Sequence, residues 1–140
     1  MEENQQLAAS VVQHMMQEDR FSQWLGIEVL EVSVGYSKIT MTIRPEMVNG
    51  FGIIHGGIAF SLADSAFAFA CNNRNNLSVA LDTAIQFTKP VHVGDVLVAE
   101  ANEIHSGRST GLYHIFIKNQ SEETVAVFKG TCFRTGKTLI

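Results

Sequence analysis

Residues 47–73 read MVNGFGIIHGGIAFSLADSAFAFACNN, and this stretch decides the fold because a glycine-rich loop runs directly into a long apolar segment. The segment 57–73 is dense in Ala and Leu, which are strong helix formers. It is apolar on nearly every side, so a helix formed by it is expected to be buried. Asparagines on both sides of Arg74 mark its end. The sequence therefore predicts one long, buried helix.

Strand-like runs lie on both sides of this helix. The sequence predicts two strands before it and four after it: 26–34, 36–44, 78–88, 94–105, 109–118 and 123–134. In the second run Ile39, Met41 and Ile43 alternate with polar residues, which is typical of a strand with one buried and one solvated face. Most connecting turns are short enough for hairpins, so an antiparallel sheet wrapped around the apolar helix is the economical packing. The expected fold class is α+β.

The beginning of the chain predicts a further helix. Over residues 3–20 the apolar residues recur at a spacing of four from Leu7 onward, as on one face of an amphipathic helix. We expect Phe21, Trp24 and Leu25 to clamp this helix onto the body of the protein.

Composition limits the domain number, the partners and the location. A chain of 140 residues with 46% hydrophobic residues suits a single domain over 1–140 with one core. The net charge of −4 provides no basic field for nucleic acid. The acidic start does not resemble a secretory signal, and the longest apolar stretch, 58–71, is shorter than the roughly 20 residues that span a bilayer. We therefore expect a cytoplasmic protein that binds neither nucleic acid nor membrane, with Cys71 and Cys132 reduced and buried.

Asp64 is the first residue that could carry chemistry. It is the only charged residue between His55 and Arg74, in a helix that is otherwise expected to be buried. A carboxylate in such a place is costly unless it is paired, hydrogen-bonded or used. Two interpretations stay open: a structural Asp bonded to Ser61 or Ser65, or a functional acid.

The motif His55-Gly56-Gly57 at the helix start is the second. Two glycines leave the first backbone N–H groups of a helix unshielded, and these donors, with the positive end of the helix dipole, suit a developing negative charge. The alternative is a tight turn in which glycine serves backbone geometry alone. Gly56 and Asp64 are eight residues apart, which is about 12 Å along a helix axis. If both groups act on one carbonyl, they must come from different subunits of a dimer.

Two further positions have weaker signals. The amide of Asn49 could hold a water molecule, or it could stabilise a turn before Gly50. The turn containing Arg108, Ser109 and Thr110 could bind a phosphate, or it could be an ordinary hairpin turn. The five histidines show no close metal-ligand spacing.

Together these residues resemble the hotdog-fold acyl-CoA thioesterases, specifically the phenylacetic acid degradation (phenylacetyl-CoA thioesterase-like) branch. The match is specific because an Asp stands nine residues after the His of the His-Gly-Gly motif and an Asn six residues before it. The resemblance covers residues 25–136, which it implies are a hotdog core with a curved antiparallel sheet around one long central helix. Residues 1–24 would then be an additional N-terminal helical segment.

The resemblance implies hydrolysis of an aromatic (phenylacetyl or hydroxyphenylacetyl type) or medium-chain acyl-CoA to free acid and CoA. The Gly56 N–H would polarise the thioester carbonyl, and Asp64 of the neighbouring subunit would be the nucleophile or the general base. Asn49 and His55 would order the loop and the attacking water. Neither a cofactor nor a metal is implied.

The resemblance also implies further substrate contacts and an assembly. The residues expected near the substrate or its CoA part are Gly57, Thr83, Lys89, Arg108, Ser109 and Thr110. Related branches place a hydroxyl one turn after the acid, where this chain has Ala68, and Thr83 could replace it. The implied assembly is a dimer with a continuous sheet and shared active sites, and usually a dimer of dimers, a homotetramer. Two other functions stay open: a dehydratase or hydratase that uses His55 for proton transfer, and a non-catalytic acyl-CoA-binding protein.

Overall fold

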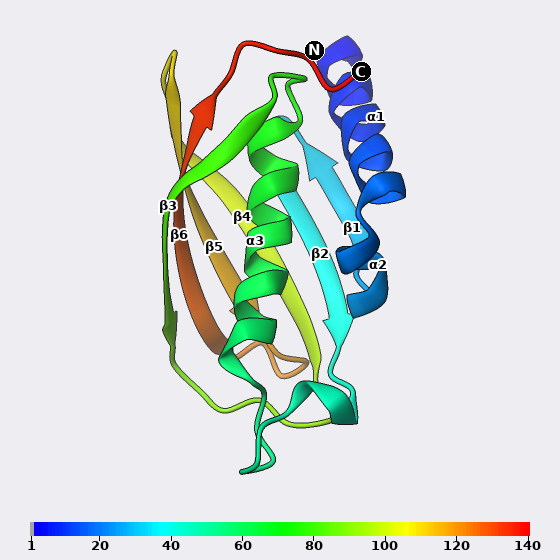
Figure 1. Cartoon of the computed structure of the whole chain (residues 1–140), viewed down its shortest axis with the longest axis vertical. Helices are drawn as coiled ribbons and strands as arrows, with labels where there is room; N and C mark the ends of the chain where they lie inside the picture. Colours follow the sequence, from blue (N-terminus) through cyan, green and yellow to red (C-terminus); the bar gives the residue numbers. More distant parts are fainter. Residues whose placement is uncertain (1) are drawn as a thin grey trace.

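The computed structural model describes residues 2–140, in which a six-stranded sheet curves around one long helix (Figure 1). The helices are α1 (Glu2–Glu18), α2 (Arg20–Leu25) and α3 (Gly56–Asn72), with a 3-10 turn η1 (Pro45–Met47). The strands are β1 (Glu28–Ser33), β2 (Tyr36–Thr42), β3 (Ser78–Phe87), β4 (Val96–Ser106), β5 (Thr110–Lys118) and β6 (Thr124–Arg134). No helix within residues 2–140 is long and apolar enough to cross a membrane.

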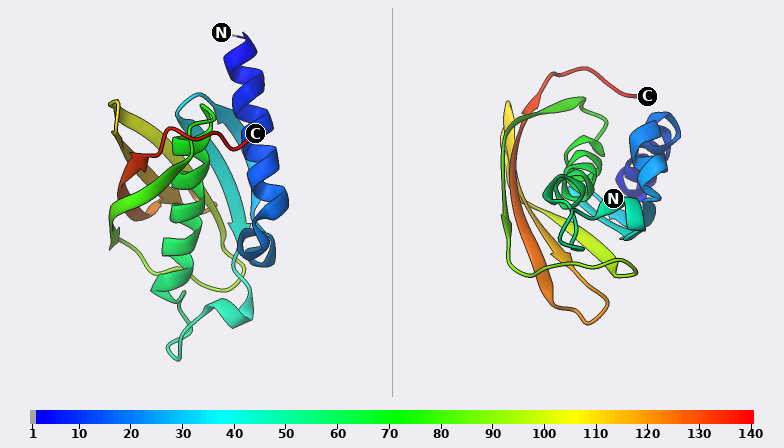
Figure 2. Two further views of the ribbon diagram at one scale, coloured as in Figure 1. Left: turned by 45° about the horizontal axis from the view of Figure 1, so that its top comes forward. Right: turned by 60° about the horizontal axis from the view of Figure 1, so that its bottom comes forward.

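The strand order is β1-β2-β4-β5-β6-β3, and every neighbouring pair is antiparallel. The end-on view in Figure 2 shows α3 inside the concave side of the sheet, with α1 beside it. The predicted α+β hotdog fold, with its six strands and central helix, is confirmed. The helix prediction over 57–73 differs from α3 by one residue at each end.

One close contact between α3 and the sheet lies at Gly130 of β6. A Cβ atom built on Gly130 would lie 2.8–2.9 Å from three ring atoms of Phe67, so only glycine lets this ring approach the strand so closely. Phe67 also packs against Tyr113 and Phe128, with ring centroids 5.6 and 5.8 Å away. These buried aromatic contacts fix the height and rotation of α3 relative to the sheet.

The N-terminal region contains the predicted amphipathic helix and one unpredicted helix. Asp19 caps α2, because its carboxylate accepts a hydrogen bond from the Ser22 N–H at 2.9 Å. Leu25 is fully buried, but Phe21 and Trp24 are 52% and 57% exposed, so the prediction that all three clamp the helix is wrong for the aromatic pair. The reason is that α2 turns these rings outward, where Trp24 stacks with Phe21 and with the Arg44 guanidinium.

The two edges of the sheet differ in their cover. At the β1 edge, the Gln5 side chain of α1 donates to the Val32 carbonyl at 2.6 Å. At the other edge, β3 pairs with β6 alone among residues 2–140, and its residues Val79, Leu81 and Phe87 are more than half exposed. A bare edge strand of ten residues offers unpaired main-chain groups to a second chain.

Candidate active site

Asn49 organises the loop that leads into α3. Its side-chain Oδ1 accepts hydrogen bonds from the N–H groups of Phe51 and Ile53 at 2.9 and 3.4 Å. Its own backbone N–H donates to the Ile53 carbonyl at 2.7 Å. Of the two interpretations of Asn49, these contacts favour the turn, since the amide oxygen is already occupied. The amide nitrogen of Asn49 makes no hydrogen bond within residues 2–140, which leaves it available to a water molecule.

His55 is the N-cap of α3. Its backbone is extended, and its Nδ1 accepts the Gly57 N–H at 3.3 Å, while its carbonyl accepts the Ile58 N–H at 2.9 Å. With Nδ1 as the acceptor, the ring is left with Nε2 as its donor. Gly57 is predicted to contact the substrate, and its N–H is occupied by His55.

The Gly56 N–H is the backbone donor that remains at the start of α3. It has no acceptor within the described residues 2–140. A Cβ atom at Gly56 would lie 3.0 Å from the Phe87 ring, so the absent side chain leaves room for this aromatic at the end of β3. The N–H therefore has two features of an oxyanion donor: it is unpaired, and it lies at the positive end of a 17-residue helix.

A groove of about 480 Å³ opens beside Gly56. It is lined by Ile53, Ile54, Gly56, Phe87, Thr88, Lys89 and Pro90. Its volume falls in the range of small-ligand sites, which are mostly apolar with a few placed polar groups. Lys89 forms an ion pair with Glu123 on the surface beside this groove.

Asp64 lies half-buried on the face of α3 that also carries Gly57, Ser61 and Ala68. Ser61 Oγ donates to the Gly57 carbonyl at 2.8 Å, and Ser65 Oγ bonds Ser22 Oγ at 2.8 Å. No hydrogen bond reaches the Asp64 carboxylate from any described residue, so the interpretation of Asp64 as a structural partner of Ser61 or Ser65 is wrong. The carboxylate is therefore available to contact a substrate or a water molecule.

The surroundings of Asp64 favour its protonated form. Burial raises the pKa of the Asp64 carboxyl above its ordinary value, and the negative charge of Asp19 raises it further. Asp19 is held by Ser22, whose Oγ donates to Asp19 Oδ2 at 2.6 Å and also bonds Ser65. A carboxylate with a raised pKa is a stronger base than an ordinary one.

The structure places some of the predicted residues at opposite ends of α3. Gly56 and Lys89 lie at the N-terminal end of the helix. The turn with Arg108 lies at the other end, because Arg134 bonds both the Gly107 carbonyl and the Cys71 carbonyl. Gly56 and Cys71 are fifteen residues apart on one helix, which is roughly 22 Å. One protomer therefore cannot bring both groups to one small ligand.

Thr83 lies between these two ends, on the concave face of the sheet. It pairs with Gly130, and residues directly opposite on neighbouring strands point to the same face. Since Gly130 faces the Phe67 ring, Thr83 faces α3 too, and it is half-buried there. Its hydroxyl makes no hydrogen bond within residues 2–140.

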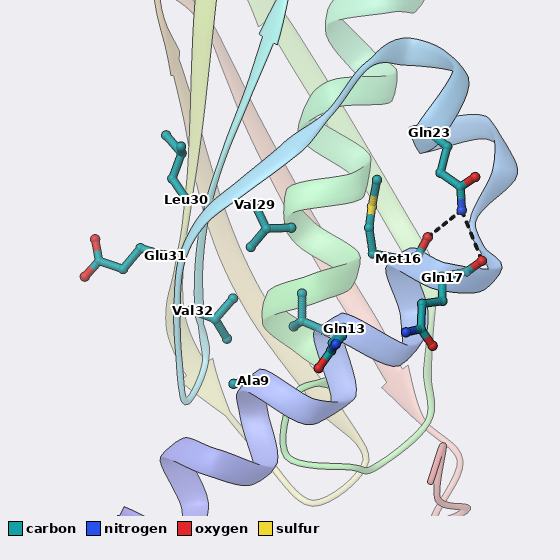
Figure 3. A pocket seen from close by; sticks show the side chains of 10 residues that line it. Ala9, Gln13, Met16, Gln17, Gln23, Val29, Leu30, Glu31 and Val32 are labelled. Carbon is teal, nitrogen blue, oxygen red and sulfur yellow. Dashed lines mark hydrogen bonds between the residues drawn. The ribbon is translucent and has the colours of Figure 1, made fainter.

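A larger hollow, of about 670 Å³, lies between α1 and β1 (Figure 3). Its lining is mainly apolar, and Gln23 is bonded to the Met16 and Gln17 carbonyls at 2.8 and 3.0 Å. Glu31 points away from it in Figure 3. None of the residues predicted to carry chemistry lines this hollow, so we place the candidate active site at α3.

Comparison with known proteins shows the family of this chain. Residues 51–126 match the family model of the thioesterase superfamily. The acyl-coenzyme A thioesterase PaaI of Escherichia coli is 42% identical over 125 residues, which cover 89% of each chain. The structure of E. coli PaaI, from the phenylacetic acid degradation operon, superposes with a TM-score of 0.94 at 40% identity, covering 96% of this chain and 97% of that one. A hypothetical thioesterase from Streptococcus pneumoniae with coenzyme A has a TM-score of 0.78 at 27% identity, covering 80% and 88%.

Proposed function

This chain belongs to the thioesterase superfamily, and from that premise we propose that it hydrolyses aromatic (phenylacetyl or hydroxyphenylacetyl type) or medium-chain acyl-CoA to free acid and CoA. The observation that carries the proposal is that one helix holds both a Gly56 N–H and an Asp64 carboxylate that have no hydrogen-bond partner among residues 2–140. Residues 1–140 act as one catalytic domain, with 1–24 as its N-terminal helical segment and 25–136 as the hotdog core.

The roles of the two groups follow from their surroundings. The Gly56 N–H polarises the thioester carbonyl and stabilises the negative charge that develops on its oxygen. Asp64 attacks the carbonyl as nucleophile, or it removes a proton from the attacking water as general base. His55 holds the start of the helix through Gly57, and Asn49 holds the loop, so both serve the geometry of the Gly56 donor. The Thr83 hydroxyl faces α3 and can orient the water.

The site is shared between two protomers. Gly56 and Asp64 of one helix are about 12 Å apart along its axis, too far to meet at one carbonyl. A two-fold axis that brings Gly56 of each chain to Asp64 of the other makes the two α3 helices antiparallel. Two features support this dimer: the helix face of Gly57, Ser61 and Ala68 is small enough for close approach, and the bare β3 edge can pair with a second β3. The full assembly is a dimer of dimers.

The antiparallel arrangement also joins the two ends of α3 in one binding site. With Gly56 of one helix beside Asp64 of the other, the C-terminal half of each helix extends past the N-terminal end of its partner. The turn with Arg108, Ser109 and Thr110 of one protomer therefore reaches the substrate whose carbonyl lies at Gly56 of the other. In this arrangement the groove beside Gly56 and Lys89 receives the rest of the substrate.

A panel of acyl-CoA esters tests the proposal, with release of free CoA thiol as the measurement. We expect hydrolysis, with the highest kcat/KM among aromatic or medium-chain esters. Loss of water from a 3-hydroxyacyl-CoA, with no thiol release, would indicate a dehydratase. Tight binding without turnover at high enzyme concentration would indicate a non-catalytic binding protein. Either result would overturn the proposal.

Asp19→Asn is expected to move the acid limb of the kcat/KM profile to lower pH. A base works only when ionised, so activity falls as the pH drops through the raised pKa of Asp64. Removing the Asp19 charge removes the second cause of that rise, while burial, the larger cause, remains. The limb therefore moves down without reaching the position of an ordinary carboxyl. Glu18→Gln, an equal change of charge at an exposed neighbour, is the control and should leave the limb in place. If the acid limb of Asp19→Asn lies at the same pH as that of wild type, Asp19 does not raise the pKa of Asp64.

Arg108→Ala is expected to raise KM for CoA esters about fivefold at low salt, the scale of one exposed ion pair of about 1 kcal/mol. Arg108 is exposed and forms no ion pair with any described residue, which leaves its guanidinium available to a phosphate. The interaction is the same in the ground state and the transition state, so kcat should change little. Steady-state kinetics at two salt concentrations measure both. A KM equal to wild type at low salt would exclude Arg108 from the substrate site.

A further inference from the structure

Arg134, the last residue of β6, is a buried cation that the proposed chemistry does not use. It is only 8% exposed, and each nitrogen of its guanidinium donates a hydrogen bond. Nε donates to the Gly107 carbonyl at 3.3 Å, Nη1 to the Cys71 carbonyl at 3.2 Å, and Nη2 to Ser106 Oγ and Tyr113 Oη at 2.9 and 3.2 Å. Its backbone N–H donates to the Ser109 carbonyl at 2.8 Å.

These bonds join two parts of the fold that are far apart in sequence. Cys71 belongs to the last turn of α3, while Gly107 and Ser109 belong to the turn between β4 and β5. A buried charge is costly, and apolar residues of similar volume often replace one without loss of stability. The Arg134 guanidinium ties a carbonyl of this turn, that of Gly107, to the Cys71 carbonyl of α3, which gives the turn a fixed position that packing alone does not provide.

The turn presents its side chains outward from this fixed base. A hydrogen bond from the Gly107 N–H to the Thr110 carbonyl, at 2.8 Å, closes it. Arg108 and Ser109 are exposed, and Thr110 is half-buried. The underside of the turn is thus bonded to Arg134, and the upper side offers a guanidinium and two hydroxyls, groups that bind phosphate.

The positive charge of Arg134 also favours phosphate binding at this end of α3. The C-terminal end of a helix carries partial negative charge, which repels a phosphate. Arg134 Nη1 bonds a carbonyl of that last turn and offsets its charge. Arg134 and Arg74 share one acid, Glu103, with N···O distances of 3.7 and 2.7 Å. Two guanidinium groups against one carboxylate leave one positive charge beneath the turn.

We propose that Arg134 is a positioning residue for the nucleotide part of CoA, holding the turn of residues 107–110 so that Arg108, Ser109 and Thr110 contact its phosphates. This inference rests on the proposed acyl-CoA hydrolysis and deepens it. Arg134 itself does not touch the substrate. Its effect reaches CoA through the geometry of the turn and through the charge that it offsets at the end of α3.

The test compares two thioesters of the same acid: the CoA ester and the N-acetylcysteamine ester, which lacks the nucleotide and its phosphates. Arg134→Lys keeps a positive charge but cannot reach all the acceptors at once. We expect KM for the CoA ester to rise about fivefold, as for the loss of one charged contact, with kcat within about twofold. The kcat/KM for the N-acetylcysteamine ester should equal that of wild type. Arg74→Lys is the matched control, because Arg74 also pairs with Glu103 but bonds no atom of the turn. It should leave both values unchanged.

Equal losses for the two esters in Arg134→Lys would mean a general structural role and would overturn the proposal. If that variant does not fold, Ser106→Ala removes one acceptor of Arg134 and should raise KM for the CoA ester alone, by a smaller factor. An unchanged KM in Ser106→Ala would then count against the proposal. Failure of this inference is distinct from failure of the function, because a wild-type protein that hydrolyses neither ester refutes the thioesterase proposal itself.

Discussion

Asp64→Asn is expected to lower turnover of acyl-CoA by at least about 100-fold, the scale on which a positioned base or nucleophile acts. The carboxylate lies on the buried central helix, and no described residue bonds it. Asparagine has the same shape but can neither remove a proton from water at neutral pH nor attack a carbonyl as a carboxylate does. The measurement is thiol release with a good CoA ester, at enzyme concentrations high enough to detect a residual rate.

The same variant should be no less stable than wild type near pH 7. The folded protein raises the pKa of Asp64, so the ionised side chain costs folding free energy at any pH above the ordinary carboxyl pKa. Asparagine is neutral and does not have this cost. A melting temperature equal to or above that of wild type would show that lost activity is not lost fold. Asp82→Asn, an equal change of charge on the solvated face of β3, is the control and should retain full turnover. Near wild-type turnover in Asp64→Asn would exclude Asp64 from catalysis.

The parts of the fold that follow local patterns could be predicted from the sequence. The apolar run after Gly57 is continuous and rich in Ala and Leu, so α3 was recognisable to within one residue. The alternation of apolar and polar residues over 36–44 was equally clear, because a period of two residues indicates a strand with one buried face. The exposed Phe21 and Trp24 could not be placed, since the outward turn of α2 depends on the Asp19 cap and on Arg44.

In the candidate site the same division holds between local and distant contacts. The unpaired N–H of Gly56 and the lone charge of Asp64 are properties of one helix and were visible in the motif. Which acceptor each serine takes was not, since Ser65 bonds Ser22, forty-three residues away. The role proposed for Arg134 could not be predicted from the sequence, because it depends on contacts with Cys71 and Gly107, which only the folded chain brings together. An arginine at the end of a strand is ordinary in a sequence, and only its burial and its partners make it a candidate.

Complementation between two inactive variants is expected to restore activity, because each active site takes Gly56 from one protomer and Asp64 from the other. The variants are Asp64→Asn and Gly56→Pro, which deletes the N–H donor. Gly56 is the first residue of α3, where proline is tolerated, and His55 before it has φ −67° and ψ 131°, the extended backbone that a residue before proline prefers. The substitution should therefore leave the helix intact, although the Phe87 ring must shift. Gly56→Ala is the matched control, because it adds a Cβ atom at the same place but keeps the N–H.

Mixing the two variants in equal amounts should recover about a quarter of wild-type activity, since about half of the dimers of a two-fold assembly are mixed and each mixed dimer has one intact site of two. That site combines Gly56 of the Asp64→Asn chain with Asp64 of the Gly56→Pro chain. Each variant alone should stay inactive, Gly56→Ala should retain most activity, and circular dichroism should show that all are folded. Mass spectrometry of the native assemblies checks that subunits have exchanged. Exchange without recovery, while Gly56→Ala remains active, would mean that the two groups do not meet across an interface, and the distance of about 12 Å along α3 would then exclude Gly56 and Asp64 from acting on one carbonyl.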